Sequence, residues 1–136
     1  MLDSDCLFCK IAKGEIPCSK VFENESIVAF LDIFPVNPGH TIIIPKKHYQ
    51  TLLDFPKRDI ASFFTQIQNI ARFLKEKLKF DGFNIIQNNF SAAGQVVPHF
   101  HFHIIPRYKG DNAILIRSTK DKATPVELED IIKKLH

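Results

Sequence analysis

The sequence predicts an α+β fold built on a mainly antiparallel sheet of about five strands. Three observations support this prediction. Short β-prone stretches outnumber helical ones, one long segment repeats its apolar residues with helical spacing, and strands and helices do not alternate strictly. With 136 residues, of which 45% are hydrophobic, the chain is expected to form a single domain with its own core.

The chain is expected to begin with a short helix and a β-hairpin. Residues 6–13 can form a helical segment that ends at Gly14. Residues 20–23 and 27–32 are β-prone, and the polar pair Asn24-Glu25 between them predicts a hairpin turn.

A loop and a buried strand follow the hairpin. Residues 33–39 contain two prolines and a glycine, which favours a loop. The continuous apolar character of residues 41–45 is typical of a central strand that is covered on both faces.

One long amphipathic helix is predicted over residues 56–79. Asp54 or Phe55 is expected near its N-cap, with Pro56 at the first helical position. Its apolar residues follow the i, i+3, i+4, i+7 pattern: Ile60, Phe63, Phe64, Ile67, Ile70, Ala71, Leu74 and Leu78.

The rest of the chain is expected to supply two more strands and a short helix. Residues 83–88 form the first strand, and a small, polar loop over residues 89–95 leads to the second. A charged linker then reaches Thr124-Pro125-Val126-Glu127, a capping box that predicts a helix ending at Leu135.

Composition excludes several classes of function. The formal net charge of +3 does not indicate extended nucleic-acid binding. No apolar run approaches the roughly 20 residues of a membrane span, and no secretory signal is visible, so we expect a cytoplasmic protein. In that compartment the three cysteines would be reduced thiols or metal ligands.

The most informative stretch is residues 97–105, where His99, His101 and His103 alternate with apolar residues. Pro98 and the Phe and Ile residues favour a strand, so the three imidazoles should share one face. Residues i and i+2 of a strand lie roughly 6.5–7 Å apart, close enough for neighbouring rings to engage one phosphate. The opposite face should be core: Phe100, Phe102 and Ile104.

This pattern has more than one interpretation. A single half-buried histidine is usually structural, but three in strict alternation favour chemistry, either nucleophilic or metal-dependent. A neutral imidazole is a competent nucleophile near pH 7, and protonated histidine neighbours could supply the positive charge that phosphoryl-type transfer needs. Gly94 would let backbone approach a phosphate closely.

The motifs resemble those of the histidine triad (HIT) nucleotide-binding family. Residues 99–105 match its pattern His-φ-His-φ-His-φ-φ, where φ is apolar. Further matches occur in the family's order: Phe8-Cys9-Lys10-Ile11, Ala29-Phe30-Leu31-Asp32-Ile33, Gly39-His40-Thr41, Ile44-Pro45-Lys46-Lys47-His48, Asn88 and Gly94-Gln95. The resemblance covers residues 5–108 approximately and leaves 109–136 as an extension.

The resemblance implies a homodimer whose two five-stranded sheets join, with a purine nucleotide bound in each subunit. Members cleave a nucleoside monophosphate from an attached group through a nucleotidyl-histidine intermediate, here on His101. By the same likeness, His40 and His103 flank the phosphate and Asp32 accepts the ribose hydroxyls. The implied base pocket comprises Phe8, Ile11, Phe30 and Ile33, and the residues near the phosphate and leaving group are Asn88, Gly94 and Gln95.

The resemblance also bears on the cysteines. Taken alone, Cys6-x-x-Cys9 could be a redox pair, half of a metal site or two small apolar residues. Some bacterial members of the family complete a structural zinc site with residues that correspond to His48 and His99. We therefore expect zinc on these four residues, no organic cofactor, and no partner for Cys18.

One departure from the family affects the substrate. The phosphoramidase branch commonly has Ser in Gly-Gln-Ser, where this chain has Val96, so amine-linked nucleotides and dinucleoside polyphosphates are both open. His103 argues against the transferase branch, which has Gln there. A nucleotide-binding adaptor with weak catalysis and a metal-dependent hydrolase are the alternatives from other classes.

Overall fold

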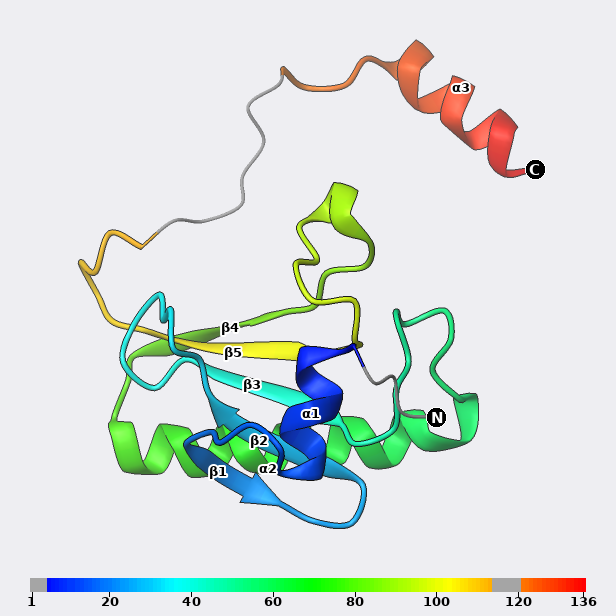
Figure 1. The fold of residues 1–136 in the computed structure, drawn as a ribbon. Helices are drawn as coiled ribbons and strands as arrows, with labels where there is room; N and C mark the ends of the chain where they lie inside the picture. The colour runs from blue at the N-terminus through cyan, green and yellow to red at the C-terminus, as the bar shows by residue number, and fades with distance from the viewer. Residues whose placement is uncertain (1–4, 114–120) are drawn as a thin grey trace.

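A five-stranded antiparallel sheet organises the protein (Figure 1). The structure is a computed structural model that describes residues 5–113 and 121–136. The strands are β1 (Lys20–Glu23), β2 (Ile27–Leu31), β3 (Thr41–Pro45), β4 (Gly82–Ile86) and β5 (Phe102–Arg107), in the spatial order β1-β2-β3-β5-β4. The helices are α1 (Leu7–Lys13), α2 (Ile60–Leu78) and α3 (Pro125–Leu135), with 3₁₀ turns η1 (Lys57–Asp59) and η2 (Ser91–Ala93). The predicted α+β class is confirmed.

The central strand β3 is buried along its whole length. It pairs with β2 over five residues, from Ile27 opposite Pro45 to Leu31 opposite Thr41. On its other side it pairs with β5, where His103 lies opposite Ile42. Figure 1 shows α1 in front of the sheet and α2 behind it, which explains why an apolar strand without alternation is stable here.

Two apolar clusters fill the opposite faces of the sheet. The cluster on the α2 side contains Phe63, Ile67, Phe100, Phe102 and Ile104, among others. The cluster on the α1 side contains Phe8, Ile11, Val28 and Phe30, and the histidine rings lie on this side. The alternation in residues 99–104 therefore divides histidines from core residues as expected.

The pairing of the histidine strand begins later than its sequence predicts. Ladder pairing of β5 starts at Phe102, so His99 and His101 precede it. The backbone there bonds to the segment after β3 instead, since the Phe100 amide donates to the Tyr49 carbonyl at 2.6 Å. β4 likewise ends at Ile86, before a loop in which Gln87 and Asn89 hydrogen-bond to each other.

The long helix also begins later than expected. Pro56 is extended, with φ −63° and ψ 132°, and precedes η1, after which α2 starts at Ile60. Asp54 and Phe55 do not cap the helix, because the amides of both residues donate back into residues 51–52 as part of a separate turn. The predicted N-cap was wrong, whereas the apolar face of α2 is as expected.

The C-terminal helix α3 has the predicted capping box, with Thr124 and Glu127 bonded reciprocally. None of its residues is buried. Part of the extension, residues 114–120, lies outside the described residues. Over the described part of the chain, no helix combines the length and apolarity that crossing a membrane requires.

Phe100 provides a test of the α2-side core. It is 1% exposed and stacks on Phe55 with 4.8 Å between ring centroids. We expect Phe100→Ala to lower the free energy of unfolding by about 3–5 kcal/mol, because the cavity it leaves cannot fully collapse. Urea denaturation measures this. Phe73→Ala, at a ring that is 48% exposed, is the control, and an equal loss in both variants would contradict the assignment of Phe100 to the core.

Candidate active site and metal centre

Two cysteines and two histidines from three separate segments meet on the α1 side of the sheet. Cys6 is the N-cap residue of α1 and Cys9 lies in its first turn, while His48 follows β3 and His99 precedes β5. Their ligand atoms all lie within 4.8 Å of one another. The structure thus brings together the four residues that were expected to bind zinc.

Hydrogen bonding determines the tautomer of His99. Its Nε2 lies 2.8 Å from the Pro45 carbonyl oxygen, which can only accept, so the ring proton is on Nε2. The lone pair of Nδ1 therefore faces Cys6 Sγ at 3.3 Å, Cys9 Sγ at 3.5 Å and His48 Nδ1 at 3.3 Å. Metal-ligating histidines commonly donate their second N–H to a carbonyl in this way.

The spacing of the four ligand atoms fits a tetrahedral zinc ion. Bonds of about 2.0–2.1 Å to nitrogen and about 2.3 Å to sulfur give edges between nitrogen and its neighbours of about 3.3–3.6 Å. The N···N separation and three of the N···S separations here run from 3.2 to 3.5 Å, and all ligand atoms lie within 4.8 Å of one another. Two sulfurs and two imidazoles are also a common donor set for structural zinc.

Burial keeps two of these groups uncharged in the absence of a cation. It raises the pKa of Cys6 to about 11 and lowers the pKa of His99 to about 4. A neutral imidazole is ready to coordinate, whereas the thiol must release its proton when a metal binds.

The main chain of His99 orients His101. Nδ1 of His101 donates to the His99 carbonyl oxygen at 2.6 Å, which leaves the lone pair of the neutral ring on Nε2. Phe8 contacts the ring edge-on, with 5.0 Å between centroids. Burial lowers the pKa of His101, so the ring is neutral near pH 7 and Nε2 is available as a nucleophile.

A second chain of hydrogen bonds orients His103. The Val36 amide donates to Nδ1 of His40 at 3.1 Å, so the proton of His40 is on Nε2. This Nε2 lies 2.9 Å from Nδ1 of His103 and donates to it. His103 then carries its own proton on Nε2, where it can donate to a ligand.

Both of these rings are neutral in the free site. Burial is the main reason that the pKa of His40 falls below its ordinary value and that the pKa of His103 falls to about 4. Asp32 opposes the shift, with Oδ2 at 3.5 Å from Nε2 of His40, but does not reverse it. The expectation that protonated histidines supply positive charge concerns a site with phosphate bound, so it stays a prediction, whereas the rings are neutral in the free protein.

The same tautomer argues against a metal among Asp32, His40 and His103. Their ligand atoms also lie within 4.8 Å of one another. A metal would need the lone pair of His40 Nε2, but the Val36 amide occupies the lone pair of Nδ1 and leaves Nε2 protonated. The arrangement is that of a hydrogen-bond chain.

The expected base pocket is only partly assembled. Phe8, Ile11 and Phe30 are buried together, and the rings of Phe8 and Phe30 lie 5.6 Å apart. Ile33 is 84% exposed and lies outside this cluster, because it follows β2 in the loop that begins at Asp32. Oδ1 of Asp32 accepts the Phe34 amide, and Oδ2 keeps accepting capacity for a ligand.

The loop between β4 and β5 carries the remaining expected residues. Gly94 has φ +95°, and a Cβ there would lie 3.8 Å from the amide nitrogen of Asn88. The Gln95 amide is already used within the protein, since it accepts from the Phe90 amide and donates to the Gln50 carbonyl. Gln95 therefore holds two loops together, and its neighbour Val96 is 90% exposed.

Sequence reasoning missed the backbone groups that set these tautomers, the Pro45 carbonyl and the Val36 amide. No side-chain pattern signals such groups. The loop before Gly94 also contains Phe90 at φ +69°, which the sequence does not predict. Phenylalanine rarely has a positive φ, so nothing in the sequence predicts this backbone conformation.

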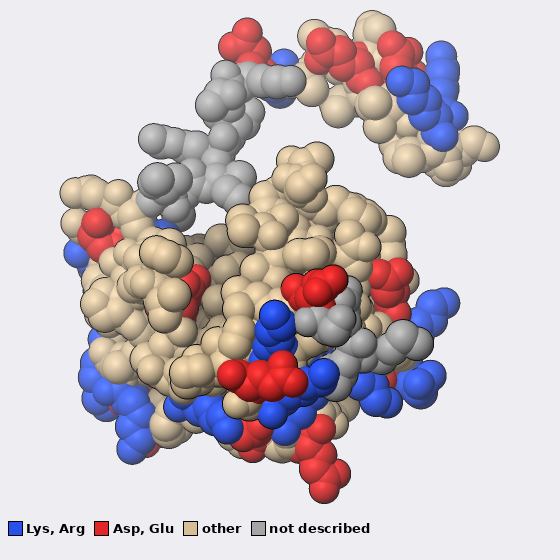
Figure 2. Space-filling model, in the orientation of Figure 1, with Lys and Arg blue, Asp and Glu red and all other residues tan. Residues whose placement is uncertain are grey.

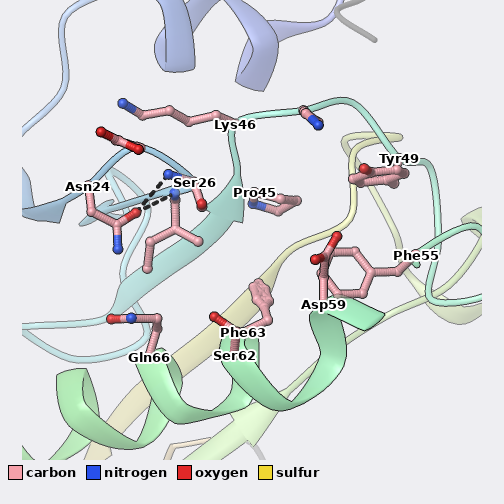
Figure 3. Close-up of a pocket in the computed structure, with 13 residues that line it drawn as sticks. Asn24, Ser26, Pro45, Lys46, Tyr49, Phe55, Asp59, Ser62, Phe63 and Gln66 are labelled. Atoms are coloured by element: carbon pink, nitrogen blue, oxygen red, sulfur yellow. Dashed lines mark hydrogen bonds between the residues drawn. The ribbon is translucent and has the colours of Figure 1, made fainter. Parts of the chain in front are cut away.

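A cavity of about 210 Å³ lies elsewhere, between the β1–β2 turn and the start of α2 (Figure 3). Pro45, Phe55 and Phe63 lie toward its interior and Lys46 lies at its edge. It contains none of the expected site residues, and its volume is below the roughly 300–1,000 Å³ of typical ligand pockets. It therefore lies apart from the residues expected to bind a nucleotide.

Comparison with known proteins identifies the family. The HIT domain profile matches residues 13–110. An uncharacterized HIT-like protein of Methanocaldococcus jannaschii is 45% identical over 130 residues, which is 96% of this chain and 98% of that protein. The Saccharomyces cerevisiae protein named adenosine 5'-monophosphoramidase HNT1 is 43% identical, over 85% of this chain and 70% of its own length. The Arabidopsis thaliana protein named adenylylsulfatase HINT3 is also 43% identical, over 81% and 56% respectively.

Solved structures of HIT family proteins have the same fold as this chain. A Bacillus subtilis HIT family protein has a TM-score of 0.85 and 37% identity, covering 97% of this chain and 95% of that one. A zinc-bound histidine triad protein of Mycobacterium smegmatis has a TM-score of 0.76 and 36% identity, covering 96% and 95%. The fold and the histidine arrangement define a HIT domain. The chain belongs to the HIT family.

The metal centre yields a direct prediction. Protein purified without added zinc should contain about one zinc ion per chain, and Cys9→Ala should lose it, since three ligands rarely hold structural zinc. Elemental analysis of both proteins measures this. Cys18→Ala is the matched control, because Cys18 is a free thiol outside the cluster. A zinc-free parent protein would count against the assignment.

Proposed function

We propose that this protein is a nucleotide hydrolase that releases a nucleoside monophosphate, AMP above all, from an attached amine, acyl or phosphate group. One observation carries the proposal. His101 is neutral, buried and held through Nδ1 by the His99 carbonyl, so its Nε2 lone pair is fixed in orientation. A nucleophile prepared in this way suits covalent catalysis at phosphorus.

The proposed reaction has two displacements. Nε2 of His101 forms a bond to the α-phosphorus while the bond to the leaving group breaks, giving a nucleotidyl-histidine. Water then attacks the phosphorus, AMP departs and the neutral ring is restored. Over both steps one water supplies the hydroxyl that remains on phosphorus and the proton that the leaving group acquires.

The neighbouring histidines have a supporting role in this proposal. His103 offers the N–H on Nε2 to a phosphate oxygen, and His40 keeps it in that tautomer through the 2.9 Å hydrogen bond. Hydrogen bonds aimed at the phosphate oxygens stabilise the charge that develops in the transition state.

The nucleoside is proposed to lie beside these groups. Asp32 keeps a carboxylate oxygen free for the ribose hydroxyls, and Phe8, Ile11 and Phe30 provide the apolar wall nearest the triad. Asn88 and Gly94 lie beyond the end of β4, on the opposite side of β5 from Asp32, where the phosphate and leaving group would extend. Ile33 can reach a base only as part of the exposed loop rim.

The proposal covers several leaving groups on the adenylate. The relatives named as a phosphoramidase and an adenylylsulfatase support adenylates with different partners. Val96 replaces the residue that the phosphoramidase branch uses there, so dinucleoside polyphosphates stay in the test set.

Zinc has a structural part in the proposal. Bound by Cys6, Cys9, His48 and His99, it would cross-link α1 to the segments that flank β3 and β5. It would thereby hold Phe8 against His101, and no chemical step passes through it.

The proposal includes a homodimer joined through β4. This strand is at one edge of the sheet, and its side chains Phe83 and Ile85 are 44% and 41% exposed. With Phe64 and other residues of α2 they line an apolar groove of about 410 Å³. An exposed apolar edge of this kind is usually covered by another chain.

The covalent mechanism can be tested at His101. His101→Ala should lower AMP release from an adenosine phosphoramidate by at least roughly a thousandfold, because the nucleophile is lost, while calorimetry still detects AMP binding. His136→Ala, at the exposed end of α3, is the control. Full turnover in His101→Ala would disprove the nucleophile.

The same assay with amine-, acyl- and phosphate-linked adenylates identifies the substrate class. Tight AMP binding without turnover of any of them would favour the adaptor.

The dimer can be tested at the sheet edge. Ile85→Lys should convert the dimer to monomer, since burying an unpaired charge in the interface costs several kcal/mol. Sedimentation velocity measures the change. Phe22→Lys, on the opposite edge strand β1 and 39% exposed, should leave the dimer intact. A wild-type monomer, or dissociation by Phe22→Lys alone, would contradict β4 pairing.

A further inference from the structure

Asn37 ties the exposed part of the loop between β2 and β3, residues 33–39, to the sheet. Among the described residues, Asn37 makes the only hydrogen bonds from residues 33–39 to β5 and the segment after it. Its amide group donates to the Pro106 carbonyl and to Oδ2 of Asp111, both at 2.9 Å. The rest of the loop is largely exposed, with Ile33 and Phe34 at 84% and 83%.

Asp111, which accepts the Asn37 side chain, is itself held in place by several hydrogen bonds. Its carboxylate accepts five hydrogen bonds: from Nε and Nη2 of Arg107, from the Asn37 amide group, and from the backbone amides of Tyr108 and Ala113. Its side chain is only 10% exposed. These bonds, those of Arg107 first, hold the pKa of Asp111 well below its usual range, so the anchor stays charged at every working pH.

The anchored loop is the one that orients the phosphate-side histidines. Val36, the neighbour of Asn37, donates its amide to Nδ1 of His40. The Asn37 carbonyl accepts the amide of His40 at 3.1 Å. Asn37 therefore fixes the loop from its side chain while its backbone and that of Val36 fix His40. The next hydrogen bond in this series is from His40 to His103.

We propose that Asn37 and Asp111 are positioning residues of the active site. By tying the loop to β5 they keep the Val36 amide on His40, and so keep the proton of His103 on Nε2. The inference rests on the proposed function for its catalytic meaning, but the tautomers themselves can be observed without turnover.

The experiment compares Asn37→Ala and Asp111→Ala with wild type by two measurements. The first is the ¹⁵N chemical shifts of the His40 and His103 imidazoles at pH 7. Wild type should show one tautomer for each ring, and the variants should show a mixture. The second is steady-state kinetics with an adenosine phosphoramidate, where kcat should fall about ten- to hundredfold, the scale of a small misplacement, with KM changed much less. Asp111→Glu, which keeps the charge, should recover part of kcat.

A matched variant separates positioning from loss of stability. Asn24→Ala removes an asparagine that holds the β1–β2 turn through the Ser26 and Ile27 amides, away from the site. It should lower the melting temperature but leave the tautomers and kcat unchanged. Wild-type tautomers in Asn37→Ala, or an equal loss of kcat in Asn24→Ala, would overturn the proposal. Absence of turnover in wild type with altered tautomers in Asn37→Ala would instead reject the proposed function and keep the positioning role.

Discussion

The candidate site depends on the two attachments of His99. Its side chain belongs to the cluster of two cysteines and two histidines, and its backbone carbonyl accepts a hydrogen bond from Nδ1 of His101 at 2.6 Å. One residue therefore joins a cross-link between α1 and the sheet to the orientation of a nucleophile. His99 is fully buried, so neither attachment competes with water. The neighbouring Phe100 anchors the same turn of chain from the other face of the sheet.

Hydrogen bonds to backbone groups determine which nitrogen of His40, His99 and His101 carries the proton. The Pro45 carbonyl selects the metal-binding nitrogen of His99, the His99 carbonyl selects the reactive nitrogen of His101, and the Val36 amide begins the series that ends at His103. The two carbonyls belong to segments that pack against the sheet, and the Val36 amide is held by the loop that Asn37 ties to β5, so the histidines are oriented before any ligand arrives. This preorganisation is the main contribution that a rigid sheet can make to electrostatic stabilisation.

Periodicity predicted the parts of the structure that burial controls. The apolar face of α2, the buried strand β3 and the division of residues 99–104 between two faces all follow from which side chains avoid water. The resemblance to the family named the four cluster residues, which the structure brings together.

The sequence did not predict details that depend on which of several polar groups a backbone amide bonds to. The start of α2 is set by a separate turn over residues 51–55, and β5 begins late because the Phe100 amide prefers a loop carbonyl. Ile33 follows a strand in sequence but faces solvent. Asn37, in Asn37-Pro38-Gly39, has the composition of an ordinary turn. Only its distance to Asp111, 74 positions later, shows what it holds.

The neutral histidines have a consequence for how a nucleotide reaches the site. The pKa of His40, His101 and His103 is lowered, and the carboxylate that acts on all three rings is that of Asp32, a negative charge. On the face shown in Figure 2, many of the Lys and Arg side chains lie along the lower edge. The charge that attracts an anionic substrate is then the formal net +3 of the whole chain rather than charge on these rings, so its association rate should depend only weakly on ionic strength. Recognition of the phosphate begins at contact, where it meets hydrogen-bond donors that carry no charge of their own.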